Sequence, residues 1–153
     1  MKNEIQEQLV ELNRLSKELD ELYHSLAKHY HIQDSALWIL YSLWESNEPC
    51  TQRDLSSLWS LSKQTINSTL KKLETAGYLR LEPLENNRKN KKIVLTAAGE
   101  KLAEQYIGPI FEAERTAFAG LTPKERSQFL HLYQKHLVLL RQETEKITGP
   151  RLP

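Results

Sequence analysis

The sequence predicts a mainly α-helical protein with a small β-hairpin. Over most of the 153 residues, apolar side chains recur every three or four positions, which is the period of an amphipathic helix. Between residues 78 and 95 the period changes, and two short apolar runs flank a polar segment, as in a hairpin. With 39% hydrophobic and 27% charged residues and no long linker, we expect residues 1–153 to form a single folded chain.

The composition excludes several classes of protein. Cys50 is the single cysteine, so no disulfide framework can form within the chain. No apolar run approaches the roughly 20 residues that span a bilayer, and the polar start is unlike a signal peptide. We therefore expect a cytoplasmic protein with no membrane partner.

Charge is distributed unevenly along a chain whose net charge is +1. Residues 51–99 carry nine Lys/Arg and four Asp/Glu, whereas residues 1–50 carry four and nine. A basic middle in a neutral chain favours a surface for a polyanion, and chance clustering on a solvated face is the alternative.

The N-terminal segment predicts a long helix over residues 3–31. Its apolar positions are spaced alternately by four and three residues, with Ser16 filling one place, which is a heptad pattern. The apolar and aromatic members of this seam are Ile5, Leu9, Leu12, Leu19, Tyr23, Leu26 and Tyr30. A helix this long cannot bury one face against a small globule alone, so we expect it to pack against a partner helix.

A second helix is predicted over residues 35–46, with Asp34 or Ser35 as its N-cap. This helix is apolar on nearly all sides, so we expect it to run through the core.

Two further helices joined by a tight turn are predicted next. Thr51 is placed to cap a helix over residues 52–59, and Ser62 to cap another over residues 63–76. Gly77 follows where a helix end needs a left-handed residue. A strand over 78–82, a polar turn over 83–91 and a return strand over 92–95 then predict the hairpin.

The C-terminal third predicts two helices. Thr96 is expected to cap the first, which continues to about residue 119 and should be kinked or interrupted at Gly108-Pro109. Residues 122–125 then supply a Thr cap, a proline at the first helical position and a Glu for a capping box. The last helix extends to about residue 146. One of its stripes consists of Phe129, Tyr133, His136 and Leu140.

Helix, tight turn, helix and hairpin in this order predict a winged helix-turn-helix. The DNA-binding region would span residues 35–95, with dimerisation helices at 3–31 and 97–146. On the helix over 63–76, helical spacing divides the residues into two faces. Those expected to face inward are Leu61, Ile66, Leu70 and Leu73, and those expected to face outward are Gln64, Asn67, Ser68 and Lys71.

The outward face is polar and basic, as required of a helix that reads DNA in the major groove. The predicted base contacts are Gln64, Thr65, Asn67 and Ser68. The predicted phosphate contacts are Lys63, Lys71, Lys72 and Arg53. The wing would reach the minor groove, where negative potential is concentrated, with Arg88, Lys89 and Lys91.

These segments resemble the multiple-antibiotic-resistance-regulator (MarR) family of bacterial transcription factors. The resemblance covers about residues 5–145 and is carried by three motifs. They are Thr65 through Leu73-Glu74-x-x-Gly77-Tyr78-Leu79, Ile93-Val94-Leu95-Thr96-x-x-Gly99, and Leu121-Thr122-Pro123-x-Glu125. The sequence departs from the family where Asn87 and Lys89 replace the Asp and Arg of the wing, where Ser68 replaces a frequent Arg, and where Leu81 replaces another.

The resemblance implies a homodimer that binds a palindromic operator in double-stranded DNA, and most often a repressor relieved by a small ligand. It also implies a ligand pocket between the dimerisation helices and the winged region. The aromatic candidates for a pocket that takes a flat, apolar effector are Tyr23, Tyr30, Trp38, Tyr41 and Trp59. Taken one by one, these residues fit an ordinary core better than a ligand pocket.

Other functions have weaker signals. Cys50 precedes a helix N-terminus that could lower the pKa of its thiol, which leaves oxidant sensing open. The five histidines lack the spacing of a metal site, although ligands from different helices would leave metal sensing open. No motif of a catalytic or cofactor site is present, so we expect neither an enzyme nor a cofactor. The alternative class is a winged-helix protein-interaction module without DNA binding, whose outward helix face would be apolar.

Overall fold

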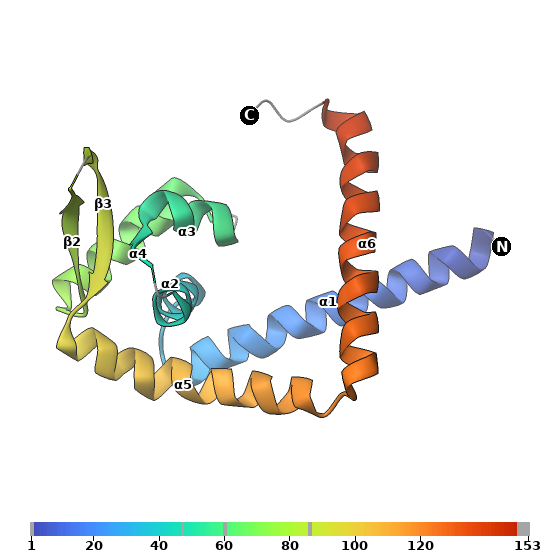
Figure 1. Cartoon of the computed structure of the whole chain (residues 1–153), viewed down its shortest axis with the longest axis horizontal. Coiled ribbons are helices and arrows are strands. Elements are labelled where there is room, and N and C mark those ends of the chain that lie inside the picture. The colour runs from blue at the N-terminus through green and yellow to red at the C-terminus, as the bar shows by residue number, and fades with distance from the viewer. Residues whose placement is uncertain (1, 47, 60, 86, 150–153) are drawn as a thin grey trace. The chain divides into compact units, whose positions relative to one another are not determined.

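The computed structural model describes residues 2–46, 48–59, 61–85 and 87–149, without the side chains of Lys2 and residues 87–89. Within this part of the chain it contains six helices and one three-stranded antiparallel sheet (Figure 1). The elements in chain order are α1 (Lys2–His29), α2 (Asp34–Glu45), β1 (Cys50–Thr51), α3 (Gln52–Trp59), α4 (Lys63–Thr75), β2 (Leu79–Leu84), β3 (Asn87–Leu95), α5 (Ala97–Ala119) and α6 (Pro123–Thr148). The mainly α-helical class with a hairpin wing is therefore confirmed.

The chain divides into two compact units, Met1–Pro109 and Ile110–Pro153. The first unit holds α1 to α4, the sheet and the beginning of α5, and the second holds the end of α5 and α6. None of the described helices is both long enough and apolar enough to cross a membrane.

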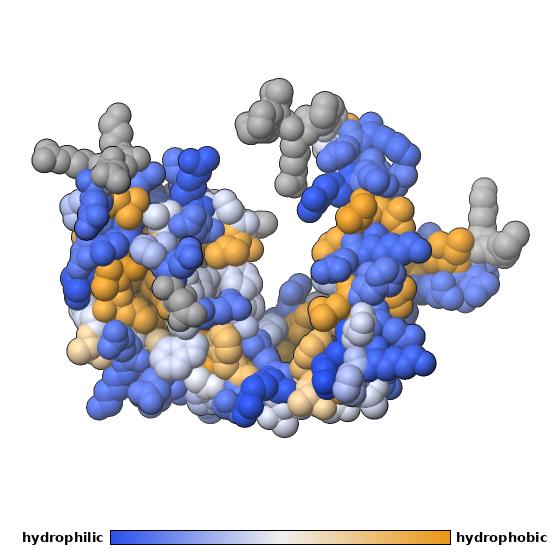
Figure 2. All heavy atoms as spheres, in the orientation of Figure 1, coloured by the Kyte–Doolittle hydropathy of each residue, from blue (hydrophilic) through white to orange (hydrophobic). Residues whose placement is uncertain are grey.

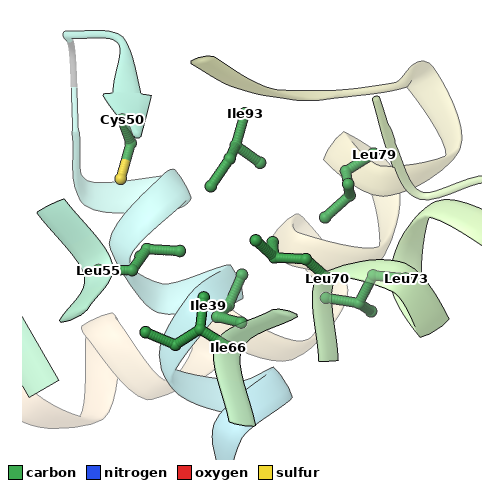
Figure 3. Close-up of a cluster of buried hydrophobic side chains, with 8 residues drawn as sticks. All are labelled: Ile39, Cys50, Leu55, Ile66, Leu70, Leu73, Leu79 and Ile93. Atoms are coloured by element: carbon green, nitrogen blue, oxygen red, sulfur yellow. The ribbon is translucent and has the colours of Figure 1, made fainter. Parts of the chain in front are cut away.

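The core of the first unit lies between α2, α3, α4 and the sheet (Figure 3). Its buried cluster consists of Ile39, Cys50, Leu55, Ile66, Leu70, Leu73, Leu79 and Ile93. Helix α4 contributes three of these side chains at spacings of four and three residues, as its apolar pattern requires. The prediction that the second helix runs through the core is confirmed, because α2 buries Leu37, Ile39 and Leu40 completely or nearly so.

The sheet is larger than the hairpin that the sequence predicts. Its strand order is β1-β3-β2, and the two-residue strand β1 pairs Cys50 with Ile93. The predicted polar turn over 83–91 is wrong, because β2 continues to Leu84 and β3 begins at Asn87. Polar residues are compatible with these longer strands, since an antiparallel ribbon can be solvated. Asn86, which also fell within the predicted turn, lies outside the described residues.

Helix starts follow the predicted caps with one exception. Ser62 accepts a hydrogen bond from the backbone N–H of Thr65, and Thr122 forms a full capping box with Glu125. The prediction that Asp34 or Ser35 caps α2 is wrong, since Gln33 occupies that position without a side-chain hydrogen bond. Both residues contact other helices instead. Asp34 contacts His24 of α1, and the buried Ser35 has its hydroxyl 2.8 Å from that of Thr69 in α4.

Helix α5 includes Gly108 and Pro109 without a break, so the predicted interruption there does not occur. A proline normally disfavours helical geometry in the residue before it, partly through a clash with that residue's Cβ. Because Gly108 has no Cβ, this part of the clash is missing, and the helix continues through both residues.

Candidate nucleic-acid interface

Helix α4 has the two faces that its sequence predicts. Ile66, Leu70 and Leu73 are buried against the core. The predicted outward residues, Gln64, Asn67, Ser68 and Lys71, are all exposed. The hairpin lies beside this helix (Figure 1). An exposed polar helix next to a β-ribbon is the arrangement that a DNA groove and its neighbouring backbone require.

A buried hydrogen bond ties α4 to α2. The hydroxyl groups of Ser35 and Thr69 lie 2.8 Å apart, and both residues are buried. Sequence reasoning did not single out either residue for this role, because Thr69 sits in a polar stretch that is otherwise exposed. The bond joins α4 to α2 and so helps to fix which face of α4 is turned toward the core.

The N-terminus of α4 is held by its own capping residues. The Ser62 and Thr65 hydroxyls lie 2.8 Å apart, and the Thr65 backbone N–H donates to the Ser62 Oγ over 3.1 Å. Thr65, a predicted base contact, is half-buried and hydrogen-bonded within this cap. It therefore differs from Gln64, Asn67 and Ser68, which are exposed.

Asn67 is connected to α3. The Nε2 of Gln52, the first residue of α3, donates a hydrogen bond to the Oδ1 of Asn67. The sequence contains no local signal for this contact, because the two residues are 15 positions apart.

Two predicted phosphate contacts and one predicted wing contact surround one hollow of about 870 Å³. Arg53 belongs to α3, Lys63 to the start of α4 and Lys91 to β3. The remaining lining residues are Thr51, Gln52, Ser56, Leu81 and Asn90. Three cations around a polar concavity create a positive potential that suits a phosphodiester.

The other predicted cationic residues have different surroundings. Lys71 is exposed on the outward face of α4. Lys72 is also exposed, but its Nζ donates to the Oε1 of Gln33 over 3.2 Å, which directs it toward the start of α2. Arg88 and Lys89 belong to β3, and their side chains lie outside what the structure describes.

Charge along the wing is partly compensated. The Glu82 carboxylate contacts Arg80 at 2.7 Å and Lys92 at 3.2 Å. Hydrogen bonds from these two cations lower the pKa of Glu82, so the carboxylate stays ionised. Successive residues of a strand point to opposite faces, so Lys91, next to the paired Lys92, projects from the other face and lines the hollow.

Four of the five predicted pocket residues form one aromatic cluster. Trp38 stacks on Trp59 with ring centroids 4.4 Å apart, and Tyr23 of α1 lies 4.8 Å from Trp38. Tyr41 contacts both tryptophan rings edge-on. The cluster joins α1, α2 and α3, and all four rings are half-buried.

Tyr30, the fifth candidate, lies apart from this cluster. It stacks on Tyr106 of α5 with centroids 4.3 Å apart. Sequence reasoning did not select Tyr106, which comes from a helix interpreted as a dimerisation element.

Neither Cys50 nor the histidines have surroundings that favour redox or metal sensing. Burial raises the pKa of the Cys50 thiol to about 11, and the Asp54 carboxylate adds to the effect. The expectation that a helix N-terminus would lower this pKa is therefore wrong, because desolvation of the thiolate dominates. Among the described residues, no group of three or more His, Cys, Asp or Glu could hold a metal ion.

Comparison with known proteins gives matches over most of the chain. The model of the MarR family matches residues 32–89. The HTH-type transcriptional regulator PecS of Dickeya dadantii is 26% identical over 132 residues, which cover 83% of this chain and 80% of PecS. The structure of S. aureus MepR in its DNA-binding conformation has a TM-score of 0.74 at 22% identity, covering 87% of this chain and 98% of that one. A MarR family regulator from Listeria monocytogenes, solved with a 26mer DNA, has a TM-score of 0.69 at 20% identity, covering 95% and 97%.

A helical core that presents one polar helix and a β-hairpin beside it defines a winged helix-turn-helix protein. Residues 32–89 of the chain match the model of the MarR family, and the curated relative PecS is an HTH-type transcriptional regulator. Members of this family are transcriptional regulators rather than enzymes.

Proposed function

We propose that this transcriptional regulator binds a palindromic operator as a homodimer, with α4 in the major groove and the wing in the adjacent minor groove. The observation that carries the proposal is the exposed polar face of α4 beside the cation-lined hollow. Gln64, Asn67 and Ser68 would contact base edges, because their amides and hydroxyls match the donors and acceptors of the major groove. No side chain is assigned a catalytic role.

The hollow between α3, α4 and β3 would hold the DNA backbone. Arg53, Lys63 and Lys91 face it from three different elements. Arg88 and Lys89, further along β3, would extend the contact into the minor groove. Lys71 would bind phosphate from the exposed face of α4, and we assign the same role to Lys72, whose present partner is the neutral Gln33 amide.

The dimer is supported by two apolar helix faces. Every described side chain from residue 3 to residue 22 of α1 is exposed, including the first four apolar members of the predicted heptad seam, Ile5, Leu9, Leu12 and Leu19. Helix α6 has no buried residue, yet it presents large apolar side chains, which Figure 2 shows in orange along its length. They are Phe129, Leu130, Leu132, Tyr133, Leu137, Val138, Leu139, Leu140 and Ile147. Exposed apolar surface on this scale is typical of an interface, and a second copy is the partner that two-fold symmetry supplies.

Relief of repression by a small ligand forms the second part of the proposal. The aromatic cluster around Trp38 contacts the last turns of α1 as well as α2 and α3. A flat apolar molecule that inserts among these rings would change how α1 meets the winged region. Because α1 would also form the dimer, such a change would alter the distance between the two α4 helices. The protein would act in the cytoplasm, where its operator lies.

The test is selection of bound duplexes from a random pool of about 30 base pairs, followed by a salt titration on the best sequence. We expect an enriched inverted repeat whose half-sites are about 10 base pairs apart, because a two-fold dimer spans one turn of DNA. We also expect affinity to fall steeply with salt as counterions are released. Failure to enrich any sequence, with a shallow salt dependence, would favour the protein-interaction module, although the polar face of α4 argues against it.

A further inference from the structure

The central residue of the exposed α4 face has its side chain held by the neighbouring helix. Asn67 is exposed, and its Oδ1 accepts a hydrogen bond from the Nε2 of Gln52 at the start of α3. The terminal torsion of a free asparagine is broad and nearly two-fold, so either end of its amide can face outward. In this structure the bond from Gln52 engages the Asn67 oxygen and turns it toward α3.

What remains for DNA is the nitrogen end of the amide. The Asn67 Nδ2 has no hydrogen-bond partner among the described residues, and it carries two hydrogen-bond donors. We propose that Gln52 is a positioning residue that makes Asn67 a donor, so that the contacted base is guanine. This inference rests on the proposed function, since it concerns how α4 reads the major groove.

Base edges differ in how they match such a donor. Guanine presents two acceptors in the major groove, N7 and O6, and thymine presents one, O4, beside its methyl group, whereas cytosine presents the donor N4. Guanine alone offers an acceptor to each of the two donors of the amide nitrogen. Adenine presents one acceptor and one donor, and an asparagine binds it best with both its oxygen and its nitrogen. An asparagine whose oxygen is already engaged therefore favours guanine over adenine and disfavours cytosine.

Two substitutions at Gln52 change the donor without touching Asn67. In Gln52→Met the side chain keeps its length but cannot donate, so the Asn67 amide becomes free to rotate and to bind adenine through both ends. In Gln52→Glu the introduced carboxylate only accepts, so it attracts the Asn67 Nδ2 and turns the oxygen outward. The position read by Asn67 should then favour cytosine, which supplies a donor.

The experiment is sequencing-based selection with the full chain, run in parallel for the parent and four variants. Asn67→Ala identifies the operator position, because discrimination is lost only there. Ser57→Ala on α3 is the matched control, since its hydroxyl bonds only to the Arg53 carbonyl of the same helix among the described residues. Circular dichroism and thermal unfolding check that every variant folds.

We expect guanine at this position for the parent and for Ser57→Ala. In Gln52→Met the adenine-to-guanine ratio should rise by about fivefold, the value of one modest hydrogen bond. In Gln52→Glu cytosine should gain over guanine, while affinity for all sequences falls because a negative charge approaches the phosphates. The measured quantity is the ratio of bases at the operator position that Asn67 contacts. A loss of affinity that is equal for all sequences leaves this ratio unchanged and does not support the inference.

Three outcomes overturn the inference while the proposed function stands. They are a parent that selects a base other than guanine at this position, Gln52 variants that keep the parent's base ratios, and an Asn67→Ala variant that alters no position. If the parent enriches no sequence at all, the proposed function fails, and the inference fails with it.

Discussion

Gly99 of α5 lies against the backbone carbonyl of Tyr78, so closely that a Cβ added to Gly99 would come within 1.8 Å of that oxygen. The same carbonyl accepts a hydrogen bond from the Thr96 backbone N–H at 3.0 Å. The Thr96 hydroxyl in turn accepts from the Gly99 N–H and donates to the Gly77 carbonyl. This junction joins the end of α4 to the start of α5, and with it the base of the wing.

We predict that Gly99→Ala destabilises the protein by about 1–3 kcal/mol, because the Tyr78 backbone must move to admit the methyl group. Gly108→Ala is the matched control within the same helix, since a Cβ there meets nothing within 4 Å. That control should be neutral or slightly stabilising, as alanine is the better helix former. Urea unfolding measures both, and equal stability of the two variants would contradict the prediction.

The buried Ser35–Thr69 pair supports a second prediction. Thr69→Val should cost about 1–3 kcal/mol, because the Ser35 hydroxyl loses its partner in the core. Adding Ser35→Ala should recover part of this loss, since both polar groups are then gone. A double-mutant cycle on unfolding free energies measures the coupling, and strictly additive losses would show that the hydroxyls do not stabilise each other.

Lys91 and Lys92 allow a test of the hollow with neighbouring residues of one strand. Lys91→Ala should weaken binding to all DNA sequences and reduce the salt slope by about 1, as expected for one lost phosphate contact. Lys92→Ala should have a smaller effect, because Lys92 already pairs with Glu82 at 3.2 Å. Binding titrations at several salt concentrations measure both slopes. Identical slopes for the two variants would remove the hollow from the DNA path.

Cys50 gives the protein a pH-dependent component of stability. Burial raises the pKa of its thiol to about 11, whereas an exposed cysteine ionises near about 8.5. Between these values the unfolded chain loses the proton and the folded chain keeps it, so folding stability falls as pH rises through this window. Below about pH 8 the contribution is fully present.

The check is the unfolding midpoint in urea at pH 8, 9 and 10 for the parent and for Cys50→Ala. The parent should lose more stability over this range than the variant, which lacks the thiol. The thiol should also react slowly with alkylating reagents at pH 7, because the thiolate is the reactive form. Parallel pH curves for the two proteins, or rapid alkylation at pH 7, would contradict the buried position of Cys50.

The sequence by itself determined where most helices begin and end and which face of α4 is buried. Ser62, Gly77 and Thr122 act locally, through backbone groups within a few residues, so their roles are visible in the sequence. The spacing of Ile66, Leu70 and Leu73 likewise reports a buried face without naming its partners. The resemblance to the MarR family added the expectation of a palindromic operator and of a ligand pocket.

Tertiary structure decided which distant residues meet. The strand at Cys50, the bond from Gln52 to Asn67 and the pairing of Ser35 with Thr69 all join positions far apart in the chain. The predicted cap at Ser35 failed for the same reason, since a hydroxyl that could bond locally found a better partner in the core. A periodic pattern states that a side chain is buried or exposed, but the identity of its neighbour depends on how separate elements pack, which no local pattern contains.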